Sequence, residues 1–133
     1  AVLNQSDLQE TVAYFEKQVG IRCETAWTLI NCDAGETGLS HKSVDQIWLF
    51  NSLHEMENPK AVVEECARVL VSEGLVIVEE ILASYAEEIH EGCGKTLFDR
   101  EELVKLFDRA GFAFVADVRK DDVATYLKFQ KEI

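Results

Sequence analysis

The chain has 133 residues, of which 47% are hydrophobic and 29% charged, and 25 acidic against 13 basic side chains give a formal net charge of −12. This length and composition predict a single packed domain over residues 1–133 and argue against disorder. The negative charge disfavours nucleic acid and anionic membrane surfaces as partners. The apolar runs are far shorter than the ~20 residues that span a bilayer, so we expect a cytoplasmic protein.

The first third of the chain predicts a helix and two buried strands. The capping-box pattern Ser6–Gln9 opens a run of regularly spaced apolar residues, which Gly20 ends as a helix stop. β-Branched and aromatic residues predict a strand over Ala26–Cys32 and another over Val44–Phe50, with Trp48 in the core.

A helix and a strand are predicted next. The pair Asn58–Pro59 is typical of a helix start, since Asn caps free N–H groups and Pro suits the first helical position. This helix is expected to run to about Val71, where Ser72–Gly74 breaks it. The following strand, Leu75–Leu82, is continuously apolar at first, as in a sheet with helices on both faces. Glu79–Glu80 are expected to mark its exposed end.

The last third predicts a helix and a hairpin. After a loose segment, Asp99 and Glu102 cap a helix that ends at Gly111. Phe112–Val118 and Val123–Phe129 flank a polar turn and predict an antiparallel pair of strands. The element order indicates an α/β sheet, in which ligands bind beyond the carboxyl ends of the strands.

The four cysteines contain no C-x-x-C pair. Cys32 and Cys66 lie in apolar segments, where a reduced thiol packs as a small hydrophobic side chain. A zinc site can be written with His90 and Cys93, but the spacing matches no standard zinc finger. The sequence therefore predicts no metal site and no disulfide.

Four stretches, in the right order, are similar to segments of class I S-adenosylmethionine-dependent methyltransferases. Asn31–Ala34 resembles the segment after the family's third strand, and Ser43–His54 resembles the fourth strand and its ending. Ala67–Gly74 is similar to the family's helix-to-strand turn, and Phe98–Phe112 to a late helix that ends in Ala-Gly-Phe. The resemblance covers essentially the whole chain and implies a Rossmann-like methyltransferase sheet, mostly parallel with a C-terminal antiparallel hairpin.

The chain departs from the family at its beginning. The resemblance starts at the end of the family's second strand, with Ala1–Leu3, so the first strand and its glycine-rich cofactor turn are expected to be missing. Asn4 stands where the family usually has an acidic residue that accepts both ribose hydroxyls. Two explanations of the missing segment stay open: the chain is a truncated relative of the family, or an upstream segment lies outside this sequence.

The resemblance implies S-adenosylmethionine as the cofactor. Asp33 matches the family residue that accepts a hydrogen bond from the adenine amino group, although Asp also simply starts turns well. Asn51 and Ser52 follow the fourth strand, where the family contacts the methionine part of the cofactor. The implied cofactor-binding residues are Asn4, Gln5, Asp33, Ala34, Asn51 and Ser52.

His54 is the candidate catalytic residue. Its unperturbed pKa near 6.5 suits a general base at the mouth of the site. The alternative is that it only fills the start of the next helix, because methyl transfer needs mainly in-line placement of donor and acceptor. Glu55, Glu79 and Glu80 would form either an acidic mouth for a cationic substrate or a solvated rim.

Two functions follow from this sequence. The first is S-adenosylmethionine-dependent methyl transfer to a small-molecule acceptor, by this chain or by a longer enzyme of which it is a truncated relative. The alternative is a non-catalytic methyltransferase-like module for binding or dimerisation. Loss of the first strand would leave sheet edges open, so we expect a homodimer, formed by strand exchange or by covering the edges.

Overall fold

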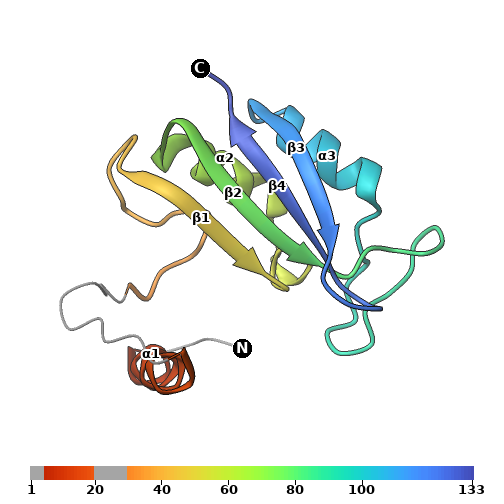
Figure 1. The fold of residues 1–133 in the computed structure, drawn as a ribbon, viewed down its shortest axis with the longest axis horizontal. Coiled ribbons are helices and arrows are strands. Elements are labelled where there is room, and N and C mark those ends of the chain that lie inside the picture. The colour runs from red at the N-terminus through yellow and green to blue at the C-terminus, as the bar shows by residue number, and fades with distance from the viewer. Residues whose placement is uncertain (1–4, 20–29) are drawn as a thin grey trace. The chain divides into compact units, whose positions relative to one another are not determined.

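The computed structural model describes residues 5–19 and 30–133 (Figure 1). The chain divides into two compact units, Ala1–Asp33 and Ala34–Ile133. The first contributes helix α1 and the second contains the sheet with its helices. A single domain over the whole chain stays a prediction.

Helix α1 spans Gln5–Val19, as the sequence predicts. It begins one residue before Ser6, so Ser6 lies within the first turn and is not the capping residue. The strand predicted over Ala26–Cys32 lies mostly outside the described residues, and Ile30–Cys32 are not in a strand.

Strand β1 spans Val44–Phe50, as predicted, and pairs in parallel with β2, Leu70–Glu80. The predicted break at Ser72–Gly74 is instead an irregularity inside β2, which begins directly after the preceding helix. The register advances two residues on β1 and five on β2 there. A Cβ on Gly74 would lie 2.9 Å from the carbonyl oxygen of Val71, so glycine permits this close backbone turn.

Strands β3, Phe112–Arg119, and β4, Thr125–Lys131, form the predicted antiparallel hairpin. The sheet order is β1-β2-β4-β3, and β4 is antiparallel to both of its neighbours. The Asp121 carboxylate closes the hairpin turn by accepting hydrogen bonds from the backbone N–H groups of Val123 and Ala124, at 2.8 Å each. These bonds lower the pKa of Asp121.

Two capped helices connect the strands. Helix α2 spans Pro59–Val69, and Oδ1 of Asn58 accepts a hydrogen bond from the N–H of Ala61 at 3.1 Å. Helix α3 spans Arg100–Asp108, and its capping carboxylate is Asp99. Both caps were predicted. A short helix, η1 (Leu53–Glu55), follows β1.

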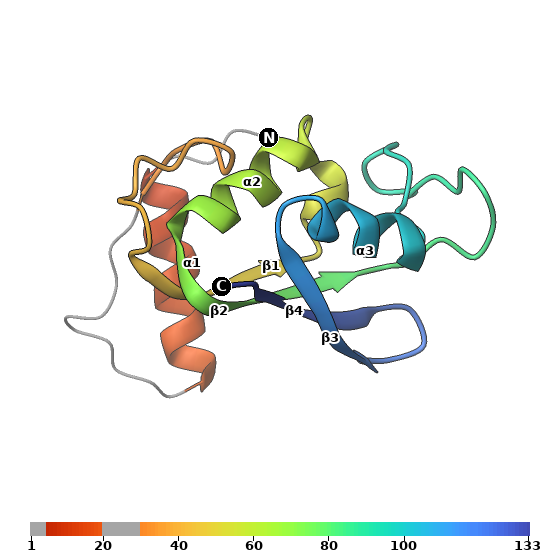
Figure 2. The ribbon, with the colours of Figure 1, turned by 90° about the horizontal axis from the view of Figure 1, so that it is seen from above.

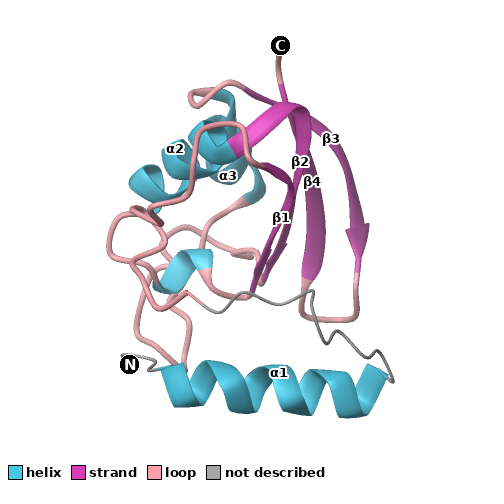
Figure 3. Ribbon diagram, turned by 90° about the vertical axis from the view of Figure 1, so that its left-hand side faces the viewer, coloured by secondary structure: helices cyan, strands magenta, loops and turns pink. Residues whose placement is uncertain are grey.

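Helices α2 and α3 cover the same face of the sheet, as Figures 2 and 3 show from two directions. The core lies between them and the strands, where Phe107 of α3 stacks on Phe129 of β4 with ring centroids 4.0 Å apart. The thiol of Cys66 is buried there, as predicted, and burial raises its pKa to about 12. Other core residues are Leu49, Val63, Val76, Val78, Leu103 and Leu127.

The opposite face of the sheet is exposed in this unit, although the sequence indicated helices on both faces. Trp48, predicted as a core residue, is 58% exposed on it. The register aligns Phe50 of β1 with Tyr126 and Val118 of the hairpin on the same side. We call this surface, formed by Trp48, Phe50, Val118 and Tyr126, the open sheet face. The prediction for Cys32 was also wrong, because its side chain is exposed.

Across the described ranges 5–19 and 30–133, every helix falls short of the length and apolar character that a membrane crossing requires.

Candidate functional site

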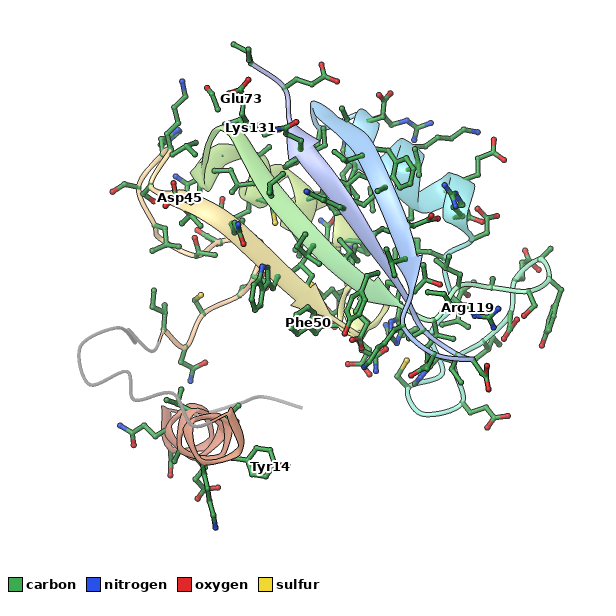
Figure 4. All side chains as sticks on the ribbon, in the orientation of Figure 1. Tyr14, Asp45, Phe50, Glu73, Arg119 and Lys131 are labelled. Atoms are coloured by element: carbon green, nitrogen blue, oxygen red, sulfur yellow. The ribbon has the colours of Figure 1, made fainter. Side chains whose placement is uncertain are left out.

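The carboxyl ends of β1 and β2 meet at one edge of the sheet because the two strands are parallel. Figure 4 labels Phe50 at this end of β1 and Asp45 at the other end. The N–H of Asn51 donates to the carbonyl of Glu79 at 2.8 Å, which joins the ends of the two strands. Asn51 has a φ of 47°, a left-handed conformation that asparagine tolerates and that turns the chain into η1. This edge is where open α/β sheets bind ligands.

A buried histidine and a buried carboxylate meet at this edge. Nδ1 of His54 lies 2.7 Å from Oε2 of Glu80, and the backbone N–H of His54 donates to Oε1 of the same carboxylate at 3.1 Å. Both side chains are fully buried. The prediction that Glu80 marks an exposed strand end was therefore wrong.

The hydrogen bond to Glu80 bears on the tautomer of the His54 ring. Burial raises the pKa of Glu80, and the neighbouring His54 together with backbone N–H groups offsets part of that rise. When Glu80 is ionised, Nδ1 of His54 carries the proton that it donates to the carboxylate. The lone pair of the ring then lies on Nε2, which is buried and has no hydrogen-bond partner among the described residues.

The predicted acidic mouth is not formed by three free carboxylates. Glu80 is buried, and Oε2 of Glu79 accepts a hydrogen bond from Nζ of Lys120 at 3.0 Å, which raises the pKa of that lysine. Glu55 alone of the three is exposed. A cationic substrate would therefore meet one free carboxylate here.

The segment between β2 and α3, predicted to be loose, is an ordered turn. Ile89 and Thr96 form an antiparallel bridge, and the N–H of His90 donates to the carbonyl of Lys95 at 2.8 Å. The His90 ring lies over His54, with centroids 4.7 Å apart. The residues just after β1 and this turn are thus parts of one site.

The predicted cofactor residues are divided between the two units. Asn4 lies outside the described residues, Gln5 is the first residue of α1, and Asp33 ends the first unit. In the second unit, Ala34 is half-buried and lines a small apolar cavity on the helix-covered side of β1.

The other two predicted residues, Asn51 and Ser52, follow β1 directly and are separated from the buried His54 by Leu53. Ser52 is the N-cap residue of η1, and its side chain makes no capping hydrogen bond. The structure therefore groups the three predicted residues that follow β1. Their roles stay predictions.

The sequence predicted Glu80 on an acidic mouth or a solvated rim and offered His90 only as a candidate zinc ligand, and it brought neither residue together with His54. A strand alternates its side chains between two faces, so Glu80 shares the inward face with Val76 and Val78, while Glu79 points to the other face. This alternation could have identified Glu80 as buried. No local pattern marks His90, because its contact partner is 36 positions earlier in the chain.

A second buried carboxylate belongs to Glu65 of helix α2. Oε1 of Glu65 accepts hydrogen bonds from the Thr37 backbone at 3.0 Å and hydroxyl at 2.7 Å, and both its oxygens bind the Arg68 guanidinium. These bonds, above all those from Arg68, lower the pKa of Glu65 to about 2. Arg68 also donates to the carbonyl of Leu39 at 2.7 Å. This network is saturated, so it holds the loop to α2 and leaves no group free for chemistry.

The sequence profile of the methyltransferase domain family matches residues 4–78, more than half of the chain. No curated protein matches the chain by sequence. Three solved structures show the shared fold. The (4+2)-cyclase SpnF superposes with a TM-score of 0.77 at 16% identity, over 98% of this chain and 64% of that one.

The other two are methyltransferases by name. An S-adenosylmethionine-dependent methyltransferase from Methanosarcina mazei has a TM-score of 0.69 at 13% identity, over 98% of this chain and 79% of that one. The third structure is the 1,6-didemethyltoxoflavin-N1-methyltransferase of Burkholderia thailandensis, solved with 1,6-didemethyltoxoflavin and S-adenosylhomocysteine. It has a TM-score of 0.74 at 13% identity, over 99% of this chain and 59% of that one. The chain thus spans less than two thirds of SpnF and of the Burkholderia enzyme.

The sheet order β1-β2-β4-β3, with a parallel pair followed by an antiparallel hairpin, agrees with the C-terminal part of the methyltransferase sheet that the resemblance implies. The matched profile shows that the chain belongs to the methyltransferase domain family, and the solved structures show that it shares the fold of such enzymes.

Proposed function

We propose that this chain serves S-adenosylmethionine-dependent methyl transfer to a small-molecule acceptor. The observation that carries the proposal is the His54–Glu80 pair at the carboxyl ends of β1 and β2, with Nε2 of the imidazole unpartnered among the described residues. The Burkholderia enzyme, which is named for a small-molecule acceptor, supports the acceptor class. The net charge of −12 supports it further, because it disfavours a nucleic-acid acceptor.

The residues present fit the cofactor in part. Asp33 offers a carboxylate that suits the adenine amino group, and Asn51 and Ser52 offer polar groups at the strand ends. When bound, the cofactor supplies an electrophilic methyl group on a sulfonium. The chain's own part is to hold the acceptor in line with that methyl group.

His54 is the proposed general base. Its Nε2 would accept the proton of an O–H or N–H acceptor as the acceptor attacks, and Glu80 would hold the ring and stabilise the imidazolium that forms. An acceptor that carries no proton at the reacting atom would not need this step. The role therefore predicts a pH dependence set by a histidine for protic acceptors only.

Titration calorimetry with S-adenosylmethionine and S-adenosylhomocysteine tests cofactor binding by this chain. Asp33→Ala is expected to weaken binding about tenfold, the cost of about one hydrogen bond to a charged group. Asp45→Ala is the matched control, because Asp45 is exposed at the opposite end of β1 (Figure 4). Absence of heat at millimolar ligand would contradict cofactor binding, and unchanged affinity in Asp33→Ala would contradict the adenine contact.

A binding or dimerisation module is the second candidate. The open sheet face favours it, because Trp48, Phe50 and Val118 are 58%, 49% and 65% exposed there. The name of SpnF, a cyclase, supports the view that this fold also serves other chemistry. The proposed partner is a second copy of the chain, by contact of these faces or by strand exchange.

Sedimentation velocity over a hundredfold range of protein concentration tests the dimer. We expect a dimer that Trp48→Asp shifts to monomer, while the exposed Tyr85→Asp on another segment leaves it unchanged. A chain that sediments as a monomer at all concentrations would rule out the homodimer.

A further inference from the structure

We infer that the carboxyl end of the sheet binds a divalent transition-metal ion, with Zn²⁺ as the expected species, through Nε2 of His54, the imidazole of His90, the thiolate of Cys93 and the carboxylate of Glu55. Potential ligand atoms of these four residues all lie within 4.8 Å of one another. This site does not depend on the proposed methyl transfer. It lies at the same strand ends as the proposed cofactor contacts Asn51 and Ser52, and it adds His90 and Cys93 from the turn between β2 and α3.

Two unpartnered ring nitrogens are the first reason. Nε2 of His54 and Nδ1 of His90 are both buried and make no hydrogen bond to any described residue. His54 is only 3% exposed, and no donor among the described residues satisfies its ring nitrogen. A buried nitrogen lone pair without a donor is unfavourable, and a bound cation would satisfy both rings at once.

Glu80 is the second reason. Histidines that bind metals usually donate their other ring N–H to a carboxylate, which sets the tautomer and the direction of the lone pair. Nδ1 of His54 makes such a contact with Glu80 at 2.7 Å, so Nε2 is left as the ligand atom. The carboxylate is held in place by a second hydrogen bond from the backbone N–H of His54, at 3.1 Å.

The turn that carries His90 and Cys93 is shaped for this arrangement. The N–H of Gly94 donates to the carbonyl of His90 at 2.9 Å, and Gly94 has a φ of 72°. A Cβ on Gly92 would lie 2.9 Å from Cε1 of the His90 ring, so glycine leaves room for the imidazole to fold back. The turn therefore presents both side chains toward His54.

The ligand chemistry selects the metal. Two imidazoles, one thiolate and one carboxylate suit Zn²⁺, which takes four such ligands in a tetrahedron at about 2.0–2.3 Å. Ligand atoms in that geometry are about 3.3–3.8 Å apart, so the cluster must close by about 1 Å from its widest separation. Cys93 would lose its thiol proton to solvent on binding, so affinity rises with pH.

The ligands form two pairs that are far apart in sequence, His54 with Glu55 and His90 with Cys93. This separation is why no standard zinc spacing appears in the chain. The metal would join the turn to η1. It would also occupy the lone pair that a general base needs, so saturating Zn²⁺ is expected to suppress any step that depends on His54.

Cobalt titration of the reduced full chain tests the site, since Co²⁺ replaces Zn²⁺ and reports its ligands by absorption. We expect one Co²⁺ per chain, a near-ultraviolet thiolate band, and displacement of Co²⁺ by Zn²⁺. Cys93→Ser should remove the thiolate band, and His90→Ala should weaken binding at least tenfold. The matched controls are Cys32→Ser and His41→Ala, which change an exposed cysteine and an exposed histidine outside the cluster.

Circular dichroism of each variant would test whether the turn substitutions leave the fold intact. The inference is overturned if the reduced chain binds no Co²⁺, or if Cys93→Ser and His90→Ala bind it as the unaltered chain does. A thiolate band lost in Cys32→Ser but kept in Cys93→Ser would also overturn it. None of these results depends on S-adenosylmethionine, so they are independent of the proposed methyl transfer.

Discussion

Helix α2 and strand β2 each carry a buried carboxylate, and the two differ in how far their neighbours satisfy them. Glu65 of α2 accepts hydrogen bonds from Thr37 and Arg68, and its pKa falls to about 2. Glu80, at the carboxyl end of β2, is buried more completely and its pKa is raised. Its partner His54 retains a buried nitrogen without a hydrogen bond to any described residue.

This difference in hydrogen-bond satisfaction suggests that Glu65 serves the stability of the fold and that the His54–Glu80 pair serves a ligand. A saturated network around Glu65 stabilises the packing of a loop on α2 and offers nothing to a ligand. Burial of the ionised Glu80 costs free energy, and Nε2 of His54 keeps a lone pair that a ligand could use. Proteins tend to keep such unsatisfied groups where they bind or react.

Replacing His54 with Ala should have the largest effect on stability. The Glu80 carboxylate would lose its partner inside the protein, and we expect the free energy of unfolding to fall by about 3 kcal/mol at pH 7. Because the pKa of Glu80 is raised, protonation relieves this cost, so the loss should shrink as the pH falls below that pKa. Urea unfolding across pH measures it, with His41→Ala, at an exposed site, as the control. A loss that does not depend on pH would contradict the unpaired-charge explanation.

Glu65→Gln should have an intermediate effect. The lowered pKa of Glu65 means that its ionised form stabilises the fold at pH values above its ordinary pKa of 4.5, and this contribution disappears as the pH falls from 4.5 to about 2. We expect a loss of about 1–2 kcal/mol at pH 7, because the network is partly exposed and therefore screened. The free energies of unfolding of the unaltered protein and of Glu65→Gln should become equal as the pH approaches 2. A difference that does not change with pH would contradict the stabilising role of the ionised Glu65.

Thr37→Val removes the hydroxyl that donates to Glu65 and accepts from the N–H of Leu39. It should cost about 1 kcal/mol, since these two hydrogen bonds are lost while the backbone N–H of residue 37 still donates to Glu65. Thermal unfolding at pH 7 measures this change. The exposed Thr96→Val serves as the control. If Thr37→Val matched the stability of the unaltered protein, the hydroxyl would not belong to the network.

Glu80→Gln should have the smallest effect on stability, within about 1 kcal/mol, because a neutral amide avoids the burial cost of a charge and keeps a hydrogen bond. Its effect on His54 should be larger. An amide N–H directed at Nδ1 moves the ring proton to Nε2 and removes the lone pair from the site. We expect Co²⁺ affinity to fall about 10–100-fold, measured by absorption. Unchanged affinity would show that Glu80 does not orient the ring.

Much of the fold was predictable because its signals are local. Asn58 and Asp99 cap the helices that the sequence predicts, and the strand Val44–Phe50 has its predicted bounds. The irregularity at Gly74 was recognised as a break but not as part of a strand, because only pairing with β1 keeps the chain extended through it.

The candidate site was predictable only in part. The position of His54 just after a strand follows from sequence order, and the sheet rule then places it at the ligand-binding edge. Glu80 contacts His54 in the interior and does not lie on a solvated rim. This position depends on which face of β2 the helices cover. The same kind of error affected Trp48. Its apolar character predicted burial, but the face of β1 on which it lies is exposed in this unit.

The amino-acid sequence by itself determined the caps of α2 and α3, the bounds of β1 and the family of this protein, because each depends on residues close together in the chain. The tertiary structure alone decided that His54, Glu80, His90 and Cys93 form one cluster. The physical reason is that burial and hydrogen-bond satisfaction arise from contacts between segments that sequence order does not specify.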